Sequence, residues 1–446
     1  GAGTPVRLGP RGAPAPRRAR VVPRAARRRI TTRNMRAPRR RSSLPGTRRD
    51  LSHVRSRFPA LSDEWALFDN AGGTVPLGTV VDRVSTYMRE CMVQVGASYA
   101  QSARAQAAVQ AGHRAAEELM NAEEGEVVLG PSSTVLAGLI ANGLRATWEE
   151  GDEIVVTDLD HEANVGAWRR LEETGIVVRE WRFREDDMAL HLEDLEPLLG
   201  PRTRLVAFTH CSNLVGRHHD ARAICERIRE AGALSCVDGV AHAPHRRVDA
   251  KALRCDLYLA SLYKICGPHV GALYGRREVL ERARSQNHFF VPEDAVPYKL
   301  EPGNVTHELV AALPAIPEYL RELDRAHGGE GTLDGAFTRI EEHEAALSAP
   351  LLEFLESRSA VTLLGPGMGP DRAPTISFVV EGRASNEVPP LLDAERIAIR
   401  YGHFYAYRLV ERMGLMERDG VVRVSMAHYN APDEVARLIA ALDAVL

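Results

Sequence analysis

Short apolar runs alternate with longer amphipathic stretches through the middle of the chain. The runs predict buried strands, since they are rich in β-branched residues and end at polar or glycine positions. They span residues 126–130, 153–157, 176–178, 205–209, 233–237 and 256–260. Helices are predicted around them, over 103–122, 135–140, 163–173, 192–199 and 221–231. This alternation predicts an α/β fold built on a mostly parallel sheet.

The pattern changes after residue 302. Helical patterns and strands then follow in the order 309–323, 333–357, 375–380, 421–425 and 433–445, of which the third and fourth are strands. Helices on a short antiparallel sheet predict a smaller α+β domain. We therefore expect a large domain over 58–302 and a small C-terminal domain over 303–446, with part of 58–75 packing against the small one.

The first 49 residues have a different composition from the rest of the chain. They contain 16 arginines and many prolines, but no lysine and no acidic residue. So basic a segment, with few apolar residues, cannot offset the entropy cost of ordering, so we predict a disordered tail over 1–57. A nucleic-acid-binding arm, a targeting peptide and an artefact of the coding sequence, with Met35 as an internal start, are its possible origins. Because the chain begins at Gly1, we favour the artefact or a tag and expect no nucleic-acid partner.

The cysteines and the hydropathy of the chain bear on its location. The six cysteines show no CxxC spacing, so neither a zinc site nor a disulfide framework is indicated. Reduced cysteines in a cytoplasmic protein are the simplest account. No apolar run in the sequence is long enough to cross a bilayer. We expect a cytoplasmic protein without a membrane partner.

Lys264 is the first candidate for chemistry. The chain has only three lysines, Lys251, Lys264 and Lys299, against a large excess of arginine. Lys264 follows a predicted buried strand and precedes a turn at Gly267-Pro268. An amine desolvated there has a lowered pKa and can act as a nucleophile, which arginine cannot. A lysine snorkelling from the end of a strand fits this segment equally well.

Polar residues follow several predicted strands, and parallel strands bring their carboxyl ends to one edge of a sheet. After the strand 126–130, the hydroxyls of Ser132, Ser133 and Thr134 precede a helix, which suits either an anion cradle or a simple N-cap. The other clusters are Asp160, His161, Glu162 and Asn164, then His210, Ser212 and Asn213, then Asp238 and His242, then Ser261, Tyr263 and Lys264. Nothing fixes a metal geometry for the histidines among them, His161, His210 and His242, so we expect no metal.

Six motifs stand in one order along the chain. They are Phe-Asp-Asn-Ala-Gly-Gly at 68–73, Asp-His-Glu-Ala-Asn-Val at 160–165, Thr-His-Cys-Ser-Asn at 209–213, Val-Asp-Gly at 237–239, Ser-Leu-Tyr-Lys at 261–264 and Arg-Val-Ser-Met-Ala-His-Tyr-Asn at 423–430. Their order resembles class V pyridoxal-phosphate enzymes, most closely the cysteine desulfurase-like branch, over nearly everything from about residue 58 onward. The resemblance implies a transferase of fold type I that binds pyridoxal 5'-phosphate. It also implies an amino-acid substrate and a homodimer with the active site at its interface.

The resemblance further implies roles for single residues. Lys264 would carry the cofactor and shuttle the α-proton of the substrate, and Asp238 would pair with the pyridinium nitrogen. Arg423 would grip a substrate carboxylate through its two-pronged guanidinium. His161 and Asn213 would contact the cofactor ring; Ser132, Ser133, Ser261 and Tyr263 its phosphate; Asn304 and Thr306 the phosphate of the partner subunit; and Asn70 and Arg400 the substrate.

Two positions depart from the desulfurase pattern. Desulfurases have a catalytic cysteine after an Arg-x-Gly-His-His motif, and the corresponding stretch here is 400–406, with Tyr405 in place of the cysteine. A phenol cannot take up sulfur as a persulfide. Ala241 stands near the place of a desulfurase glutamine, and Cys266 suits packing better than it suits a replacement nucleophile. We therefore predict an enzyme that forms no persulfide.

Several reactions at the α-carbon stay open in the sequence. We favour β-elimination, such as C–S lysis of cysteine or a conjugate, because it needs only Lys264 and a good leaving group. Racemisation would need a second base, for which His403, Tyr405 and His242 are candidates. An aminotransferase or an epimerase of secondary metabolism is therefore an alternative. A non-catalytic binding or regulatory protein on the same scaffold is the rival from another class, against which the retained lysine and Arg423 argue.

Overall fold

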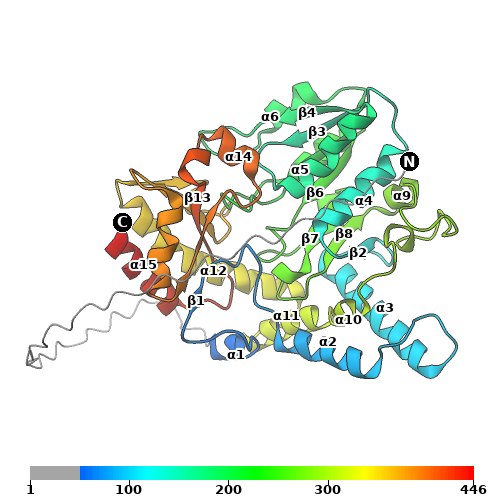
Figure 1. The fold of residues 1–446 in the computed structure, drawn as a ribbon, viewed down its shortest axis with the longest axis horizontal. Coiled ribbons are helices and arrows are strands. Elements are labelled where there is room, and N and C mark those ends of the chain that lie inside the picture. Colours follow the sequence, from blue (N-terminus) through cyan, green and yellow to red (C-terminus); the bar gives the residue numbers. More distant parts are fainter. Residues whose placement is uncertain (1–50) are drawn as a thin grey trace, which may run out of the picture. The chain divides into compact units, whose positions relative to one another are not determined.

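A seven-stranded sheet forms the centre of the computed structural model, which describes residues 51–446 (Figure 1). Its strands are β2 (Val127–Gly130), β3 (Glu153–Thr157), β4 (Val177–Trp181), β5 (Thr203–Thr209), β6 (Leu234–Asp238), β7 (Leu257–Ser261) and β8 (Gly271–Gly275). They lie in the order β2-β8-β7-β6-β5-β3-β4. All pairs are parallel except those that β8 makes with β2 and β7. The predicted α/β fold with a mostly parallel sheet is confirmed.

Helices cover both faces of this sheet because its strands are apolar on both sides. Within β5, Leu205 and Ala207 pack into one core cluster, whereas Val206 and Phe208 pack into another. The first cluster includes the helices α4 (Ser133–Arg145) and α5 (Glu162–Arg169). The second includes α2 (Gly78–Glu90), α3 (Ala100–Met120), α7 (Ala221–Glu230), α10 (His307–Val310) and α11 (Ala315–Ala326). Three short helices, α6 (Leu192–Leu195), α8 (Ala250–Leu253) and α9 (Arg277–Arg282), complete this part.

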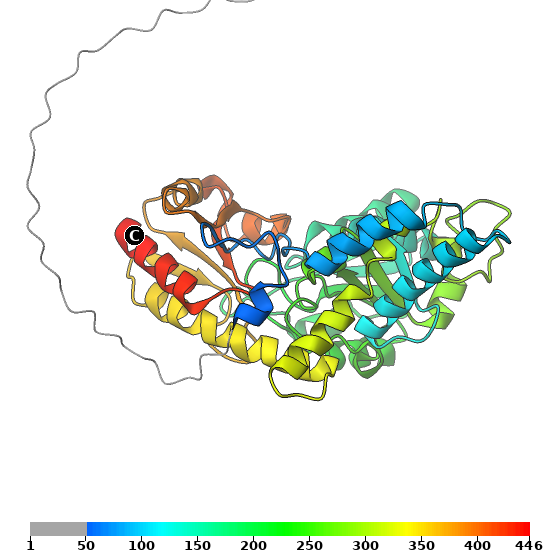
Figure 2. The ribbon, with the colours of Figure 1, turned by 90° about the horizontal axis from the view of Figure 1, so that it is seen from below.

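A four-stranded antiparallel sheet lies in the C-terminal part of the chain. Its order is β12 (Arg400–Gly402), β13 (Val421–Ser425), β10 (Thr375–Val380) and β9 (Val361–Leu364). Its helices are α12 (Leu333–Glu356), α13 (Pro389–Asp393), α14 (Tyr407–Arg412) and α15 (Pro432–Val445). Figure 2 shows α12 and α15 lying side by side along this sheet. The predicted α+β region is therefore present, and its division from the large domain at residue 302 stays a prediction.

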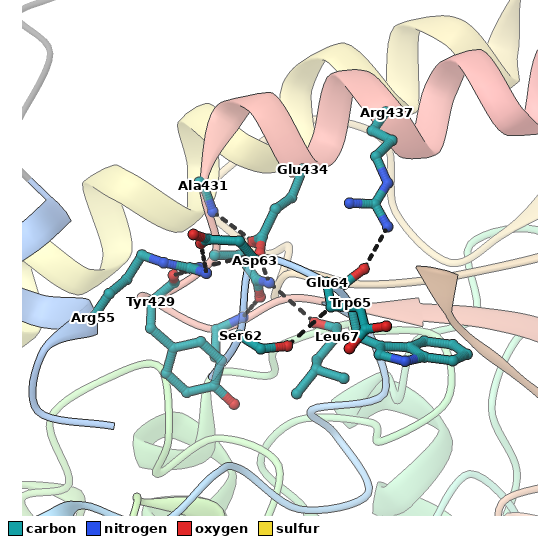
Figure 3. Close-up of polar contacts among 12 residues, drawn as sticks. Arg55, Ser62, Asp63, Glu64, Trp65, Leu67, Tyr429, Ala431, Glu434 and Arg437 are labelled. Atoms are coloured by element: carbon teal, nitrogen blue, oxygen red, sulfur yellow. Dashed lines mark hydrogen bonds and ion pairs between the residues drawn. The ribbon is translucent and has the colours of Figure 1, made fainter. Parts of the chain in front are cut away.

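The segment before the large sheet packs against the C-terminal helix (Figure 3). It contains α1 (Leu51–Arg55) and β1 (Ala66–Leu67), which pairs in parallel with β11 (Ile397–Ala398). Arg55 donates to the carbonyl of Tyr429 and to Glu434, each at 3.1 Å, and Asn430 donates to the carbonyl of Leu67 at 3.0 Å. These bonds place β1, and with it Asp69, beside the small sheet.

Two predictions about local structure need correction. Residues 51–55 of the tail predicted over 1–57 are helical instead, in α1, and bury Val54; residues 1–50 lie outside the described part of the chain. The helix predicted over 309–323 is divided into α10 and α11, because Pro314 lacks the N–H that a continuous helix would need. Among residues 51–446, none of the helices has the length and apolar character that crossing a membrane requires.

Candidate active site

One cavity lies at the carboxyl ends of β5, β6 and β7 and at the N-terminus of α4. Eight residues predicted from the sequence to bind the cofactor line it together: Ser132, Ser133, His161, Asn213, Asp238, Ser261, Tyr263 and Lys264. The parallel order of the strands explains this convergence, since ligands in such sheets bind beyond the carboxyl ends of the strands. We call these residues the lysine site. Their proximity is an observation, and their individual roles stay predictions.

Lys264 lies in a single 3₁₀ turn, Leu262–Lys264, directly after β7. Its side chain is only 7% exposed. The pKa of Lys264 is lowered to about 8, mainly by burial and then by the charge of Arg423, against the opposing charges of Asp238 and Asp69. A substantial fraction of this amine is therefore neutral near neutral pH, as a nucleophile or a base requires.

Asp238 ends β6, and its carboxylate accepts a hydrogen bond from the N–H of Val240 at 2.9 Å. Burial raises the pKa of Asp238, while the Val240 N–H and the charge of Lys264 oppose the shift. Asp160 lies near it and accepts from the hydroxyl of Thr157 at 2.7 Å. Burial and then the charge of Asp238 raise the pKa of Asp160 to about 8, so Asp160 holds its proton at neutral pH.

The N-terminus of α4 combines the two roles that its hydroxyls suggest. Ser132 caps the helix by accepting from the N–H of Val135 at 3.2 Å, while Ser133 and Ser261 place their hydroxyls 3.1 Å apart at the cavity. A Cβ on Gly271 would lie 2.3 Å from the carbonyl carbon of Ser132, so the approach of β8 to this helix end requires glycine. Free N–H groups, the helix dipole and paired hydroxyls form a site suited to a phosphate.

His161 caps α5, because its Nδ1 accepts a hydrogen bond from the N–H of Ala163 at 3.1 Å. Burial, together with the charges of Lys264 and Arg423, lowers the pKa of His161 to about 4. The imidazole is therefore neutral and carries its proton on Nε2. Its ring centroid lies 5.1 Å from that of Tyr405.

Residues 402–406 connect the small sheet to α14, and we call them the bridging segment. Phe404 and Tyr405 both have left-handed backbones, with φ of 48° and 61°. Two bonds from the large-sheet side hold them: Asn213 Nδ2 donates to the carbonyl of Phe404 at 2.8 Å, and the N–H of Glu162 donates to that of Tyr405 at 2.8 Å. Tyr405 also donates its N–H to Nδ1 of His403 at 3.1 Å. The segment therefore links the small sheet to the lysine site.

Arg423 lies on β13 and is only 2% exposed. Its Nη2 donates to Asp69 at 2.9 Å, and its Nη1 donates to the carbonyl of Asn213 at 3.1 Å. Its guanidinium carbon lies 3.7 Å from the ring centroid of Phe404. Burial lowers the pKa of Arg423 to about 10, so the guanidinium stays charged at neutral pH. Arg400, 61% exposed, approaches the other oxygen of Asp69 at 3.6 Å.

Several predicted residues do not line the cavity, among them Arg423, Arg400, His403, Tyr405, Asn70 and Asn304. Asn70 is buried and bonded to the carbonyls of Leu67 and Ser425, to Asn430 and to Tyr429. A substrate contact by Asn70 stays a prediction that would require one of these bonds to be exchanged. Asn304 has a left-handed backbone with φ of 69° and is exposed. Its predicted contact concerns the partner subunit and also stays a prediction.

The histidines considered for a metal do not converge. His210 and His242 stack with ring centroids 3.5 Å apart, and Nδ1 of His242 lies 3.1 Å from Nδ1 of His218. Burial lowers the pKa of all three imidazoles, which keeps them neutral. Within residues 51–446, no cluster of three or more His, Cys, Asp or Glu side chains is arranged to hold a metal ion.

The sequence assigns no role to Asp69, which pairs with Arg423, or to Phe404, which covers Arg423. Asp160 is named among the polar residues after the strands, but the electrostatic influence of Asp238 on it is not predicted. Asp69 and Asp160 stand inside quoted motifs, so their presence was visible and their partners were not. Phe404 lies in the departing stretch 400–406, where its difference from the desulfurase histidine is the available signal.

Comparisons with known proteins agree with this geometry. The aminotransferase class-V family model matches residues 66–438. The aminotransferase-like protein FGM3 of Gibberella zeae is 38% identical over 406 residues, covering 89% of this chain and 98% of that protein. The cysteine desulfurase-like protein ustD of Aspergillus flavus is 34% identical over 410 residues, covering 89% and 91%. The apo structure of a cysteine desulfurase from Thermococcus onnurineus NA1 has a TM-score of 0.79 at 25% identity, covering 88% and 97%.

Members of this family use pyridoxal 5'-phosphate, and the residues of the cavity fit that cofactor. Lys264 offers a buried amine for covalent attachment, and Asp238 offers a buried carboxylate for a protonated ring nitrogen. Hydroxyls at the start of α4 offer donors for a phosphate. This chain therefore belongs to the class V aminotransferase family, in its cysteine desulfurase-like branch, and is a pyridoxal-phosphate-dependent enzyme.

Proposed function

We propose that this enzyme catalyses a β-elimination on a cysteine-derived amino acid and cleaves its C–S bond without forming a persulfide. The observation that carries the proposal concerns thiols. All six cysteines lie within the described residues and are buried, whereas the exposed position of the bridging segment holds Tyr405. A persulfide needs a thiolate that the sulfur of the substrate can reach. Cys211 lines the cavity, but burial raises the pKa of its thiol to about 12.

The residues around the cavity supply the remaining requirements. When bound, pyridoxal phosphate withdraws electron density from the α-carbon of the substrate. The neutral amine of Lys264 takes up the α-proton, and the electron pair left at the α-carbon forms a double bond as a thiolate leaves the β-carbon. Arg423 orients the substrate through its carboxylate. His161, held neutral, adds no positive charge beside the cofactor ring.

The test is turnover by the holoenzyme with L-cysteine and an S-alkyl-L-cysteine, following pyruvate, ammonia and released thiol or sulfide together. Equal amounts of pyruvate and ammonia, with no sulfur left on the protein by mass spectrometry, are expected. Protein-bound persulfide after incubation with cysteine would contradict the proposal. Chirality and keto-acid formation from a panel of other amino acids identify an epimerase or an aminotransferase.

The non-catalytic alternative is separated by spectroscopy. An absorbance band of the lysine-bound cofactor in the purified protein, absent from Lys264→Ala, supports an enzyme. Deletion of residues 1–49 tests the arginine-rich segment. Unchanged turnover of the shortened protein, together with no nucleic-acid binding by the full chain, excludes a regulatory role for that segment. The cytoplasmic location predicted from the cysteines stays part of this proposal.

We also propose a homodimer, because apolar side chains are exposed together on α2 and the loop after it. Val81 and Met88 lie seven positions apart on one face of α2, and Met92 and Tyr99 follow in the loop. Light scattering is expected to give twice the mass of the chain. A Val81→Glu and Met88→Glu double variant would shift that mass to the monomer, whereas an unchanged dimer would place the interface elsewhere.

A further inference from the structure

The guanidinium of Arg423 has one donor left without a partner. Its Nη1 and Nη2 are bonded to the carbonyl of Asn213 and to Asp69, but its buried Nε finds no acceptor among the described residues. A buried donor without an acceptor destabilises the folded protein, because its hydration is lost and nothing replaces it. Arg423 is 2% exposed, so bulk water does not satisfy this N–H. Six other arginine Nε atoms among the described residues also lack an acceptor, so this N–H is a free donor that a ligand can use and is not by itself the mark of a ligand site.

Asp69 could satisfy this donor if the guanidinium turned. One oxygen of Asp69 already accepts from Nη2, and arginine and carboxylate readily form two parallel bonds through Nε and Nη2. That arrangement would neutralise Arg423 with a side chain of the protein and leave no fork for a substrate. Something must therefore hold the plane of the guanidinium in its present orientation.

Phe404 supplies that constraint. Its ring centroid lies 3.7 Å from the guanidinium carbon of Arg423, a stacking contact that fixes the plane of the cation and covers one of its faces. A ligand must then approach Arg423 in the plane, at its edge. Arg400 lies 6.0 Å from the same ring and directly opposite Arg423 in the β12–β13 pair, so Phe404 contacts two arginines that would otherwise repel each other.

The backbone shows that the position of this ring is specified. Phe404 and the following Tyr405 both have left-handed backbones, a conformation that is strained for a residue other than glycine. Asn213 and Glu162 hold the two carbonyls with bonds of 2.8 Å. Asn213 also accepts from Arg423 through its own carbonyl, so one residue fixes both the ring and the cation that the ring covers.

We propose that Phe404 is a positioning residue that pins the plane of the Arg423 guanidinium and so reserves its Nε–H edge for the carboxylate of the substrate. This rests on the proposed function only in that Arg423 binds that carboxylate. Phe404 touches neither the α-carbon nor the cofactor in this inference. It acts through Arg423, and it therefore governs affinity for the carboxylate rather than the rate of bond cleavage.

The test compares Phe404→Leu, which keeps an apolar side chain without a π face, with the aromatic variant Phe404→Trp. In the holoenzyme, Phe404→Leu is expected to raise KM for the amino-acid substrate roughly tenfold, and to change kcat by no more than about twofold. Phe404→Trp is expected to keep the KM of the wild type. The absorbance band of the bound cofactor and the melting temperature show that each variant is folded and loaded.

Binding of propionate, followed through the cofactor band, gives a readout that is independent of turnover. Wild type and Phe404→Trp are expected to bind propionate and not propionamide, and Phe404→Leu to bind it roughly tenfold more weakly. Adding Asp69→Asn to Phe404→Leu removes the competing carboxylate, so the double variant recovers part of the lost affinity. A merely structural role for Phe404 predicts no such recovery.

Several outcomes overturn the inference. They are an unchanged KM and propionate affinity in Phe404→Leu, a loss confined to kcat, no recovery in the double variant, and a wild type that ignores propionate. Failure of the proposed function looks different. It appears as carboxylate binding that depends on Phe404 as described, in a protein that releases no thiol from any cysteine derivative.

Discussion

Lys264 and Asp238 are buried at the ends of parallel strands, whereas Tyr405, in the bridging segment, is 64% exposed on a left-handed backbone. The lysine site is built from regular strands and helix ends, and its backbone needs no strain. The bridging segment holds its geometry through two hydrogen bonds to another part of the chain. Strained backbone at a functional site persists only where its surroundings fix it. We infer that the lysine site determines which cofactor binds, and that the bridging segment determines which substrate is accepted and which reaction follows.

The contrast between the lysine site and the bridging segment fails if the lysine site can be altered without loss of turnover. Lys264→Ala is expected to lower turnover by roughly 10²–10⁴-fold, the usual contribution of a positioned acid–base group, and to abolish the absorbance band of the bound cofactor. Lys251→Ala is the matched control, because Lys251 is an exposed lysine paired with Glu123. It should leave both measurements unchanged. Comparable turnover in both variants would show that Lys264 is not the cofactor-bearing base.

The bridging segment should decide the fate of sulfur. Tyr405→Cys places a thiol at an exposed position whose ring now lies 5.1 Å from His161. With L-cysteine, this variant is expected to accumulate up to one persulfide sulfur per chain by mass spectrometry, whereas wild type accumulates none. Tyr405→Ser is the matched control, since it removes the ring without adding a thiol. A persulfide in the Tyr405→Ser variant would mean that a buried cysteine accepts the sulfur.

The acid stability of the protein should depend on the buried histidines behind the lysine site. Burial lowers the pKa of His210 to about 3 and those of His218 and His242 well below 6.5, so the unfolded chain binds protons that the folded one does not. Stability is therefore full above about pH 6.5 and falls as pH drops toward 3, by ~1.4 kcal/mol per pH unit for each histidine. Asp160, with its pKa raised to about 8, acts in the opposite direction between pH 8 and 4 and offsets about one of them.

Urea unfolding between pH 7 and pH 5 measures this slope. His242→Phe keeps a ring stacked on His210 but removes one titrating group, so the slope is expected to fall by ~1.4 kcal/mol per pH unit. His288→Phe, at an exposed position, is the control and should leave the slope unchanged. An equal slope in all three proteins would show that these histidines do not govern acid unfolding.

How far the sequence predicted each region follows from the kind of signal each one carries. The strands that place Asp238 and Lys264 are apolar runs, and their carboxyl ends converge by the rules of parallel sheets, so the lysine site could be assembled without a structure. The ion pair of Asp69 with Arg423 joins segments 354 positions apart, and no local pattern reports it. The left-handed backbone at positions 404 and 405 has no sequence signal, because neither residue is a glycine. The division of the helix at Pro314 does have a local signal, because proline lacks the N–H that a continuous helix needs.

The smallest expected effect is the change in stability when the strained backbone at Tyr405 is relieved. Tyr405→Gly relieves a backbone held at φ of 61°, and the exposed phenol ring contributes little burial, so the free energy of unfolding should stay equal or rise by ~1 kcal/mol. The KM should nonetheless rise, because glycine loosens the segment that places Phe404 over Arg423. Ala394→Gly, in an ordinary right-handed conformation, is the control and should lose stability without losing activity. If Tyr405→Gly instead lost stability and kept full activity, the strain in the bridging segment would serve the fold, and the contrast with the lysine site would disappear.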